Sequence, residues 1–369
     1  MSEFRTENND GLCREGILAF DNVEIQTPLY APTRSEWDNL NYSPYVERED
    51  YRGVKMGILG YWLNQYSIDR ITSDSQAYSS LKYYLKRRIS ALETPVKLLH
   101  FDFYSEVETL GIASLKLLLR LQNDIGVDSV EIPNSSSFVW DYSMAIDKAN
   151  KWKTNENIER PLMGIATEPR DVVILASKIS QIDSIGASLR KENFPLLYKL
   201  EETIKPLDDV WIHGFSTPRS YRKISWTGTL GMFLNIYGID TVNSLIQHSA
   251  GIKNFILTQQ EKTEDELLES SYNLKYFKPG DYSTFKYETL EAQNGSDYRL
   301  SNYCNCPVCQ NNTLKSLVSD FELSAINTRA HEAISHLNES KSLRKKISDN
   351  ESNLYLTSKE FARKLSERK

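Results

Sequence analysis

Three cysteines within six residues have the residue types and spacing that point most directly to chemistry. The segment reads Cys304-Asn-Cys306-Pro-Val-Cys309, and closely spaced thiolates can share one tetrahedral Zn²⁺ ion. A fourth ligand is expected from the helix predicted to follow, which carries His331 and His336. A separation of five residues turns these imidazoles roughly 140° apart on a helix, so only one should face the metal. His331 is preferred and His336 is the alternative; a site closed by Cys₃His ligation is structural rather than catalytic.

Alternating strands and helices must position any other site. Apolar runs such as KMGILGYW, PVKLLHFDF and RPLMGIA predict strands, and the amphipathic segments between them predict helices. About seven or eight βα units are expected, most simply as a (β/α)₈ TIM-type barrel carrying a zinc-binding subdomain. A doubly wound open sheet is the alternative, although no GxGxxG follows a strand.

Changes in composition divide the chain into four expected parts. Residues 1–12 read as a disordered leader and residues 13–260 as the barrel body, in which the polar stretch 35–52 should be a loop. Residues 261–340 read as an insertion and zinc-binding subdomain that closes the barrel. Residues 341–369 read as a basic helical segment.

Charge is distributed unevenly along the 369 residues, whose net charge is −6. Segment 341–369 holds nine Lys/Arg and four Asp/Glu, hence +5, which leaves −11 for the rest. This segment could contact phosphates, or it could be a solvated helix. No run approaches the roughly 18 apolar residues of a membrane span, and the polar N-terminus is not a secretory signal. A cytoplasmic protein without membrane contact is therefore expected.

The cysteine cluster resembles the CxCxxC…H zinc motif of the tRNA-guanine transglycosylase superfamily, whose members are (β/α)₈ barrels. Five earlier segments resemble motifs of that superfamily in the same order. They are Arg14–Leu18 with Thr27–Pro32, Leu121–Asp128, Ile182–Gly186, His213–Pro218 and Gly238–Ser244. The resemblance covers roughly residues 13–350. It extends to queuine and archaeosine tRNA-ribosyltransferases and to the branch that inserts 7-deazaguanines into DNA.

The resemblance implies a base exchange through a covalent glycosyl-enzyme intermediate. A carboxylate attacks the anomeric carbon of a guanosine, guanine leaves, and a 7-deazaguanine displaces the enzyme. Asp102, after the apolar run VKLL, falls at the position of the superfamily's proton-transfer aspartate. Asn243 occupies the position of the nucleophilic aspartate. Asp240, three residues earlier, could replace it only if the loop register shifted, since an odd separation on a strand points side chains to opposite faces.

Base recognition is implied at four further positions. Asp128 would lie at the pocket floor, and Gly186 belongs to a segment similar to the superfamily's I-G-G strand. Glu168 would accept hydrogen bonds from a purine, or would instead be an acid at a helix N-terminus. Tyr104 could stack on a flipped base, or simply pack at the barrel rim. His213 is expected to be a hydrogen-bonded structural histidine.

Three functions remain open from the sequence. The first is a zinc-containing transglycosylase acting on guanine in tRNA or DNA, with a 7-deazaguanine such as preQ0 as the incoming base. The second is a non-catalytic, zinc-containing partner subunit that positions nucleic acid, which the amide at Asn243 favours. The third is an unrelated zinc-stabilised barrel enzyme. The resemblance also implies a homodimer or heterodimer.

Overall fold

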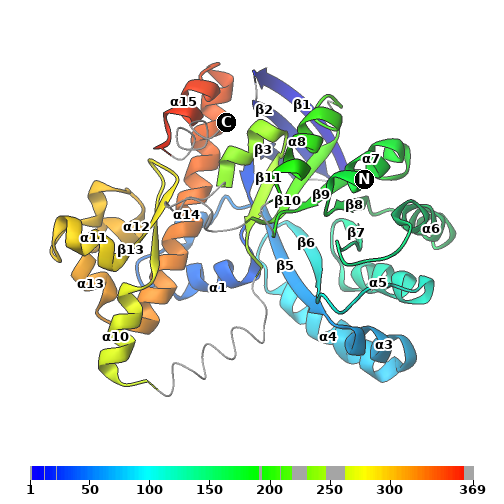
Figure 1. Ribbon diagram of the computed structural model, residues 1–369, viewed down its shortest axis with the longest axis horizontal. Helices are drawn as coiled ribbons and strands as arrows, with labels where there is room; N and C mark the ends of the chain where they lie inside the picture. Colours follow the sequence, from blue (N-terminus) through cyan, green and yellow to red (C-terminus); the bar gives the residue numbers. More distant parts are fainter. Residues whose placement is uncertain are drawn as a thin grey trace. The chain divides into compact units, whose positions relative to one another are not determined.

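The computed structural model describes residues 2–11, 13–21, 23–190, 193–207, 209–217, 231–246 and 262–360 (Figure 1). Its strands are β1 (Ser2–Asp10), β2 (Cys13–Phe20), β3 (Val23–Thr27), β4 (Leu29–Tyr30), β5 (Met56–Leu63), β6 (Val96–Phe103), β7 (Val130–Ile132), β8 (Leu162–Ala166), β9 (Ser184–Ser188), β10 (Trp211–Thr217), β11 (Thr241–Ser244), β12 (Lys275–Lys278) and β13 (Ser283–Lys286). Its α-helices are α1 (Arg34–Tyr42), α2 (Arg48–Tyr51), α3 (Gln65–Ser73), α4 (Ser75–Ser90), α5 (Ile112–Ile125), α6 (Tyr142–Asn155), α7 (Pro169–Ser177), α8 (Phe194–Thr203), α10 (Glu264–Tyr272), α11 (Tyr287–Asn294), α12 (Pro307–Gln310), α13 (Leu314–Val318), α14 (Phe321–Ser348) and α15 (Ser352–Ser358).

The chain forms two compact units. The first consists of Met1–Arg34, Lys55–Thr217 and Leu234–Ile246. The second consists of Ser35–Val54 and the described parts of Pro218–Phe233 and Gln247–Lys369.

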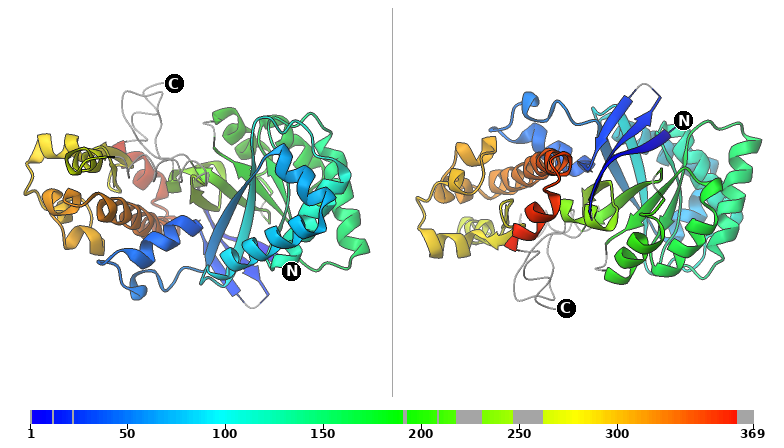
Figure 2. Two further views of the ribbon diagram at one scale, coloured as in Figure 1. Left: turned by 90° about the horizontal axis from the view of Figure 1, so that it is seen from below. Right: turned by 90° about the horizontal axis from the view of Figure 1, so that it is seen from above.

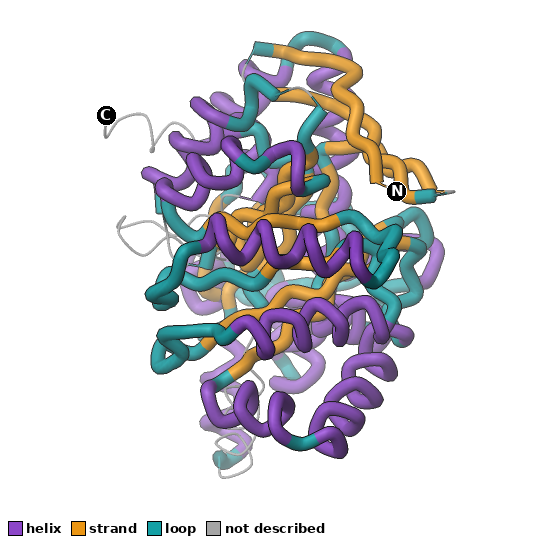
Figure 3. Tube along the Cα trace, turned by 90° about the vertical axis from the view of Figure 1, so that its right-hand side faces the viewer, coloured by secondary structure: helices purple, strands orange, loops and turns teal. Residues whose placement is uncertain are grey.

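Parallel strands alternate with helices through the first unit, which confirms the predicted mixed α/β class. Six strands form one sheet in the order β4-β11-β10-β9-β8-β7, and β5 pairs in parallel with β6. Isolated parallel bridges join Thr33 to Ile58 and Leu98 to Ser129. Helices α3 to α8 lie on the outer side of these strands (Figures 2 and 3). Strands β7 and β8 are buried at every position, as expected for parallel strands covered on both faces.

Helix α5 illustrates how local sequence sets these elements. Its apolar residues recur with helical spacing, and Leu115, Leu118 and Leu119 are buried. The helix ends at Gly126, which has a φ of 87°. Because a side chain is strained in this left-handed region, glycine stops the helix and turns the chain into β7, as the sequence predicted.

The N-terminal residues are ordered, so the predicted disordered leader is wrong for Ser2–Asp10. This segment pairs with β2, which in turn pairs with β3, in an antiparallel sheet. Phe4 is 5% exposed and packs in the core of the first unit with Leu18. One buried aromatic ring and backbone pairing with β2, interrupted by a register shift between Thr6 and Asn8, thus offset the polar composition of the leader.

Segment 35–52 was expected to be a loop and instead forms most of α1 and all of α2. Trp37 and Leu40, three residues apart, are both buried on one helix face. Ser43 Oγ donates to Asn327 Oδ1 on α14 at 2.7 Å. Tertiary burial of two large apolar side chains outweighs the polar propensity of the segment.

Helix α14 is the central element of the second unit, against which the β12–β13 hairpin and helices α10, α12 and α13 pack. The expected helical C-terminal segment is helical at the end of α14 and through α15; residues 361–369 lie outside the described residues. Within the described parts of the chain, no helix is long and apolar enough to cross a bilayer.

Candidate functional site

Cys304, Cys306, Cys309 and His331 come together in the second unit and could bind a metal ion. One ligand atom from each of the four lies within 4.8 Å of all the others. His331 Nδ1 is 3.2 Å from Cys306 Sγ and 3.3 Å from Cys309 Sγ. The three cysteines are free thiols, and those of Cys306 and Cys309 are buried. The backbone N–H of Cys306 donates to Cys304 Sγ at 3.4 Å, which stabilises negative charge on that sulfur.

His331 is oriented so that its lone pair faces the sulfurs. Its Nε2–H donates to the backbone carbonyl of Phe277 at 2.6 Å, which leaves Nδ1 unprotonated when the ring is neutral. The ring of Tyr276 stacks on His331 with centroids 4.4 Å apart. Burial and the neighbouring sulfurs raise the pKa of Tyr276 well above its usual range, and its protonated hydroxyl lies 3.2 Å from Cys309 Sγ.

These donors fit a tetrahedral metal. Thiolate and imidazole bonds of about 2.3 and 2.0 Å give an S···N edge of about 3.5 Å, close to the observed separations. The carbonyl that holds His331 is the outer partner that metal-bound histidines usually have. His336 is outside this group of ligands; its ring stacks on Phe277 with centroids 4.5 Å apart. The arrangement therefore fits His331, the preferred ligand, rather than His336.

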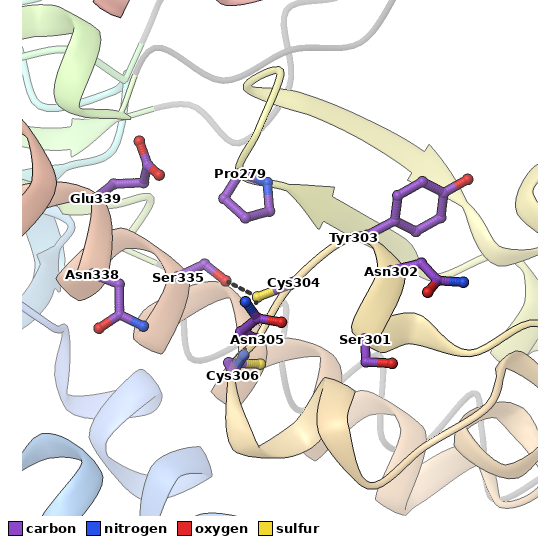
Figure 4. A pocket seen from close by; sticks show the side chains of 10 residues that line it. All are labelled: Pro279, Ser301, Asn302, Tyr303, Cys304, Asn305, Cys306, Ser335, Asn338 and Glu339. Carbon is purple, nitrogen blue, oxygen red and sulfur yellow. Dashed lines mark hydrogen bonds between the residues drawn. The ribbon is translucent and has the colours of Figure 1, made fainter.

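A cavity of about 300 Å³ borders the cysteine cluster (Figure 4). The half-buried Cys304 faces it, with Ser335 Oγ 3.6 Å from the sulfur. Asn338 and Glu339 of α14 and Pro279 of the β12–β13 hairpin complete one side. Glu339 accepts from the Tyr355 hydroxyl at 2.7 Å.

In the first unit, Asn243 completes a buried chain of hydrogen bonds. Trp211 Nε1–H donates to Thr241 Oγ1 at 2.8 Å. Because Asn243 Oδ1 can only accept, Nε2 of the neutral His213 carries the proton, and Nδ1 accepts from the Thr241 hydroxyl at 2.6 Å. His213 Nε2–H then donates to Asn243 Oδ1 at 3.0 Å. Burial lowers the pKa of His213 to about 3. An amide at position 243 therefore matches a neutral imidazole, as expected for a structural histidine.

Asp240 is held in an ion pair. Its two oxygens accept from Arg14 Nε at 2.8 Å and Nη2 at 2.7 Å, and Asp240 Oδ2 also accepts from the Ile212 N–H at 2.8 Å. Both side chains are buried. Asp240 precedes β11, at its amino end, whereas Asp102 lies near the carboxyl end of β6. The structure thus gives Asp240 a structural partner and does not bring it to Asp102.

His100 and Glu131 form a second buried pair. Nδ1 of His100 lies 2.6 Å from Glu131 Oε2, and Glu131 Oε1 accepts from the Phe101 N–H at 3.2 Å. Burial alone lowers the pKa of His100, but the charge and hydrogen bond of Glu131 outweigh it and the pKa is raised. Sequence reasoning missed both residues. An acid inside the otherwise apolar strand β7 was the available signal for Glu131.

Asp102 lies between the side chains of Arg190 and His100. Arg190 Nη1 is 3.2 Å from Asp102 Oδ2, and His100 Nε2 is 3.7 Å from Asp102 Oδ1. The Arg190 guanidinium lies over the Trp62 ring at 3.8 Å, and Tyr104 packs edge-on against the same ring. The predicted residues Asp102 and Tyr104 therefore belong to one cluster. Arg190 follows β9 in a loop and had no signal in the sequence.

Gly186 makes room for an aromatic ring inside the first unit. A Cβ at this position would lie 2.4 Å from Ile165 Cδ1 and 2.7 Å from Phe215 Cε2. The Phe215 ring can therefore cross β9 closely and stack on His100, with centroids 4.2 Å apart and planes 9° apart. This glycine is required by packing, and its predicted role in substrate binding remains a hypothesis.

The two remaining predicted residues have structural partners. Asp128, at the amino end of β7, accepts from the Lys97 N–H at 2.7 Å. Glu168 is the residue before α7 and pairs with Arg170. Glu168 thus sits at a helix N-terminus, the alternative that its sequence context left open, and Asp128 lies at the strand end opposite to Asp102.

Neither the known protein-family models nor the curated proteins include a match to this chain.

Proposed function

We propose that Cys304, Cys306, Cys309 and His331 hold a zinc ion with a structural role. Three sulfurs and one imidazole nitrogen are the donor set typical of closed zinc sites. When bound, the ion would cross-link the segment 304–309 to α14. The carbonyl of Phe277 and the hydroxyl of Tyr276 would orient and stabilise the ligands.

We further propose that the chain exchanges guanine for a 7-deazaguanine base in tRNA or DNA. The observation that carries this proposal is the carboxylate of Asp102, held between His100 and Arg190 near the carboxyl end of a parallel strand. Carboxylates in such a place can stabilise the cationic sugar of glycosyl transfer. The choice of guanine as the outgoing base and a 7-deazaguanine as the incoming base comes from the sequence resemblance to the transglycosylase superfamily.

A closed (β/α)₈ barrel is part of this proposal. The bridges from Thr33 to Ile58 and from Leu98 to Ser129 would join the ends of the two parallel sheets in the first unit. His100 on β6 stacks on Phe215 of β10, although these two strands belong to different sheets and are not paired with each other. Contact between strands that are not paired with each other is expected when a sheet closes into a barrel.

A non-catalytic partner subunit is the second candidate, and two contacts favour it. Asn243 is an amide bound to a neutral His213, and Asp240 is neutralised by Arg14. In this account, Asp102 and Arg190 would only shape a surface that positions nucleic acid for a catalytic partner.

Exchange assays separate the two candidates. The protein would be incubated with radiolabelled guanine and either mixed tRNA or mixed-sequence duplex DNA, beside Asp102→Asn and Asp147→Asn variants. Asp147 is an exposed carboxylate paired with Lys178 and serves as the matched control. The transglycosylase proposal expects incorporation that Asp102→Asn abolishes and Asp147→Asn preserves. Nucleic-acid binding without incorporation would favour the partner subunit instead.

A further inference from the structure

A groove of about 190 Å³ lies between helices α5 and α6 of the first unit. Lys116 lines it from α5, and Lys148, Lys151, Trp152 and Asn155 line it from α6. Separations of three, four and seven residues put these α6 side chains on one face of the helix. Because Trp152 is buried, the three lysines give the groove its positive charge over an apolar wall.

None of the three ammonium groups forms an ion pair or a hydrogen bond with another described residue. Asp147, the acid closest to them in the sequence of α6, is engaged by Lys178 at 2.7 Å. Glu156 is the one carboxylate among the residues that line the groove. Three cations thus face one anion, and like charges a single turn apart on a helix repel each other. A bound anion would relieve that repulsion.

The groove belongs to a larger basic face formed by α4, α5 and α6. These helices pack against one another in chain order on the outer side of the strands (Figure 1). Together they hold nine Lys/Arg and two Asp/Glu, hence +7, in a chain whose net charge is −6. Positive charge is therefore concentrated on this face, where it can attract a polyanion.

A nucleic acid matches this face better than an anionic membrane does. Lysines bind phosphates as point charges, and a row of them on rigid helices can meet the repeated charges of a phosphodiester backbone. A helix that lies on a membrane also needs a row of exposed large apolar side chains. On α6, which is described throughout, Met144 alone is of this kind.

We propose that the groove between α5 and α6 binds the phosphate backbone of a nucleic acid through Lys116, Lys148 and Lys151. This inference deepens the proposed function and rests on it for the class of partner. It adds an anchoring surface on the outer helices, whereas Asp102 lies on a strand. Contacts of this kind hold the nucleic acid in place without reading its sequence.

The test measures binding by the full chain to fluorescein-labelled tRNA and to mixed-sequence duplex DNA, by fluorescence anisotropy at several KCl concentrations. The double variant Lys148→Gln/Lys151→Gln should bind about tenfold more weakly at 100 mM KCl. On duplex DNA the slope of log affinity against log salt should become shallower by about two, because each phosphate contact contributes about 0.9. Lys199→Gln/Lys346→Gln removes the same charge from α8 and α14 and should bind as the wild type does.

Each outcome decides the inference. An unchanged affinity in Lys148→Gln/Lys151→Gln, or an equal loss in the control variant, would overturn the groove. Binding to phosphatidylserine vesicles without binding to either nucleic acid would assign the face to a membrane and overturn it as well. In these cases base exchange that depends on Asp102 would still stand on its own assay, so the two proposals fail separately. A wild type that neither binds nor modifies either nucleic acid would remove both.

Discussion

At position 243, an amide allows an imidazole to stay neutral inside the first unit. His213 donates to Asn243 Oδ1 and accepts from Thr241, so each ring nitrogen has one defined role. A carboxylate in place of the amide would attract a second proton to the ring. The amide of Asn243 is therefore consistent with its neighbours.

This neutral histidine predicts a pH-dependent loss of stability. The folded-state pKa of His213 is about 3, below its ordinary value of about 6.5. A depressed pKa gives stability that is complete above the unfolded-state pKa and declines as pH falls toward the folded-state pKa. Between pH 6 and 4.5 the wild type should lose about 1.4 kcal/mol per pH unit more than His213→Gln. Urea unfolding at several pH values measures this, and parallel curves would contradict it.

The ion pair of Asp240 predicts a large cost for its removal. Asp240→Ala leaves the buried Arg14 guanidinium without its carboxylate, which should lower the free energy of unfolding by about 3–5 kcal/mol. Asp147→Ala removes an exposed carboxylate and should change it by less than about 0.5 kcal/mol. Urea denaturation compares the two. An Asp240→Ala protein of unchanged stability that had lost base exchange would instead assign Asp240 to catalysis.

At the scale of elements, the packing of the Phe215 ring against β9 depends on one missing side chain. Gly186→Ala places a methyl group 2.7 Å from the Phe215 ring and should cost about 1–3 kcal/mol through overpacking. Gly280→Ala, where a Cβ meets nothing within 4 Å, is the matched control and should be nearly neutral. Thermal unfolding of both variants checks this, and equal midpoints would show that the ring moves freely.

Elements with strong periodicity were predictable, and those fixed by tertiary burial were not. The apolar pattern predicts α5 and Gly126 predicts where it ends, because both signals lie within the segment itself. Trp37 and Leu40 are buried by tertiary contacts such as the Trp37–Tyr51 ring pair, and Phe4 orders β1 only through the core. The cysteine cluster was predictable from spacing. The partnership of Glu131 with His100 joins residues 31 apart and had no local signature.

For the whole molecule, the proposed function depends on a metal centre in the second unit and a charged cluster in the first. The four ligands come from the segment 304–309 and from α14, so metal binding would join parts of the chain that are distant in sequence. Binding energy at a structural zinc site contributes directly to folding. The proposed reaction rests on a sequence resemblance whose main motif is this cysteine cluster. A chain that bound no metal would therefore lose the main support for the proposed function.

Metal content of the purified chain is the most direct test. Elemental analysis should find one zinc ion per chain in the wild type and in Cys13→Ser, which removes a buried thiol from β2. Cys309→Ser should lose the metal, and X-ray absorption of the wild type should show about three sulfurs near 2.3 Å and one nitrogen near 2.0 Å. A wild-type protein without stoichiometric zinc, or a Cys309→Ser protein that retains it, would contradict the account.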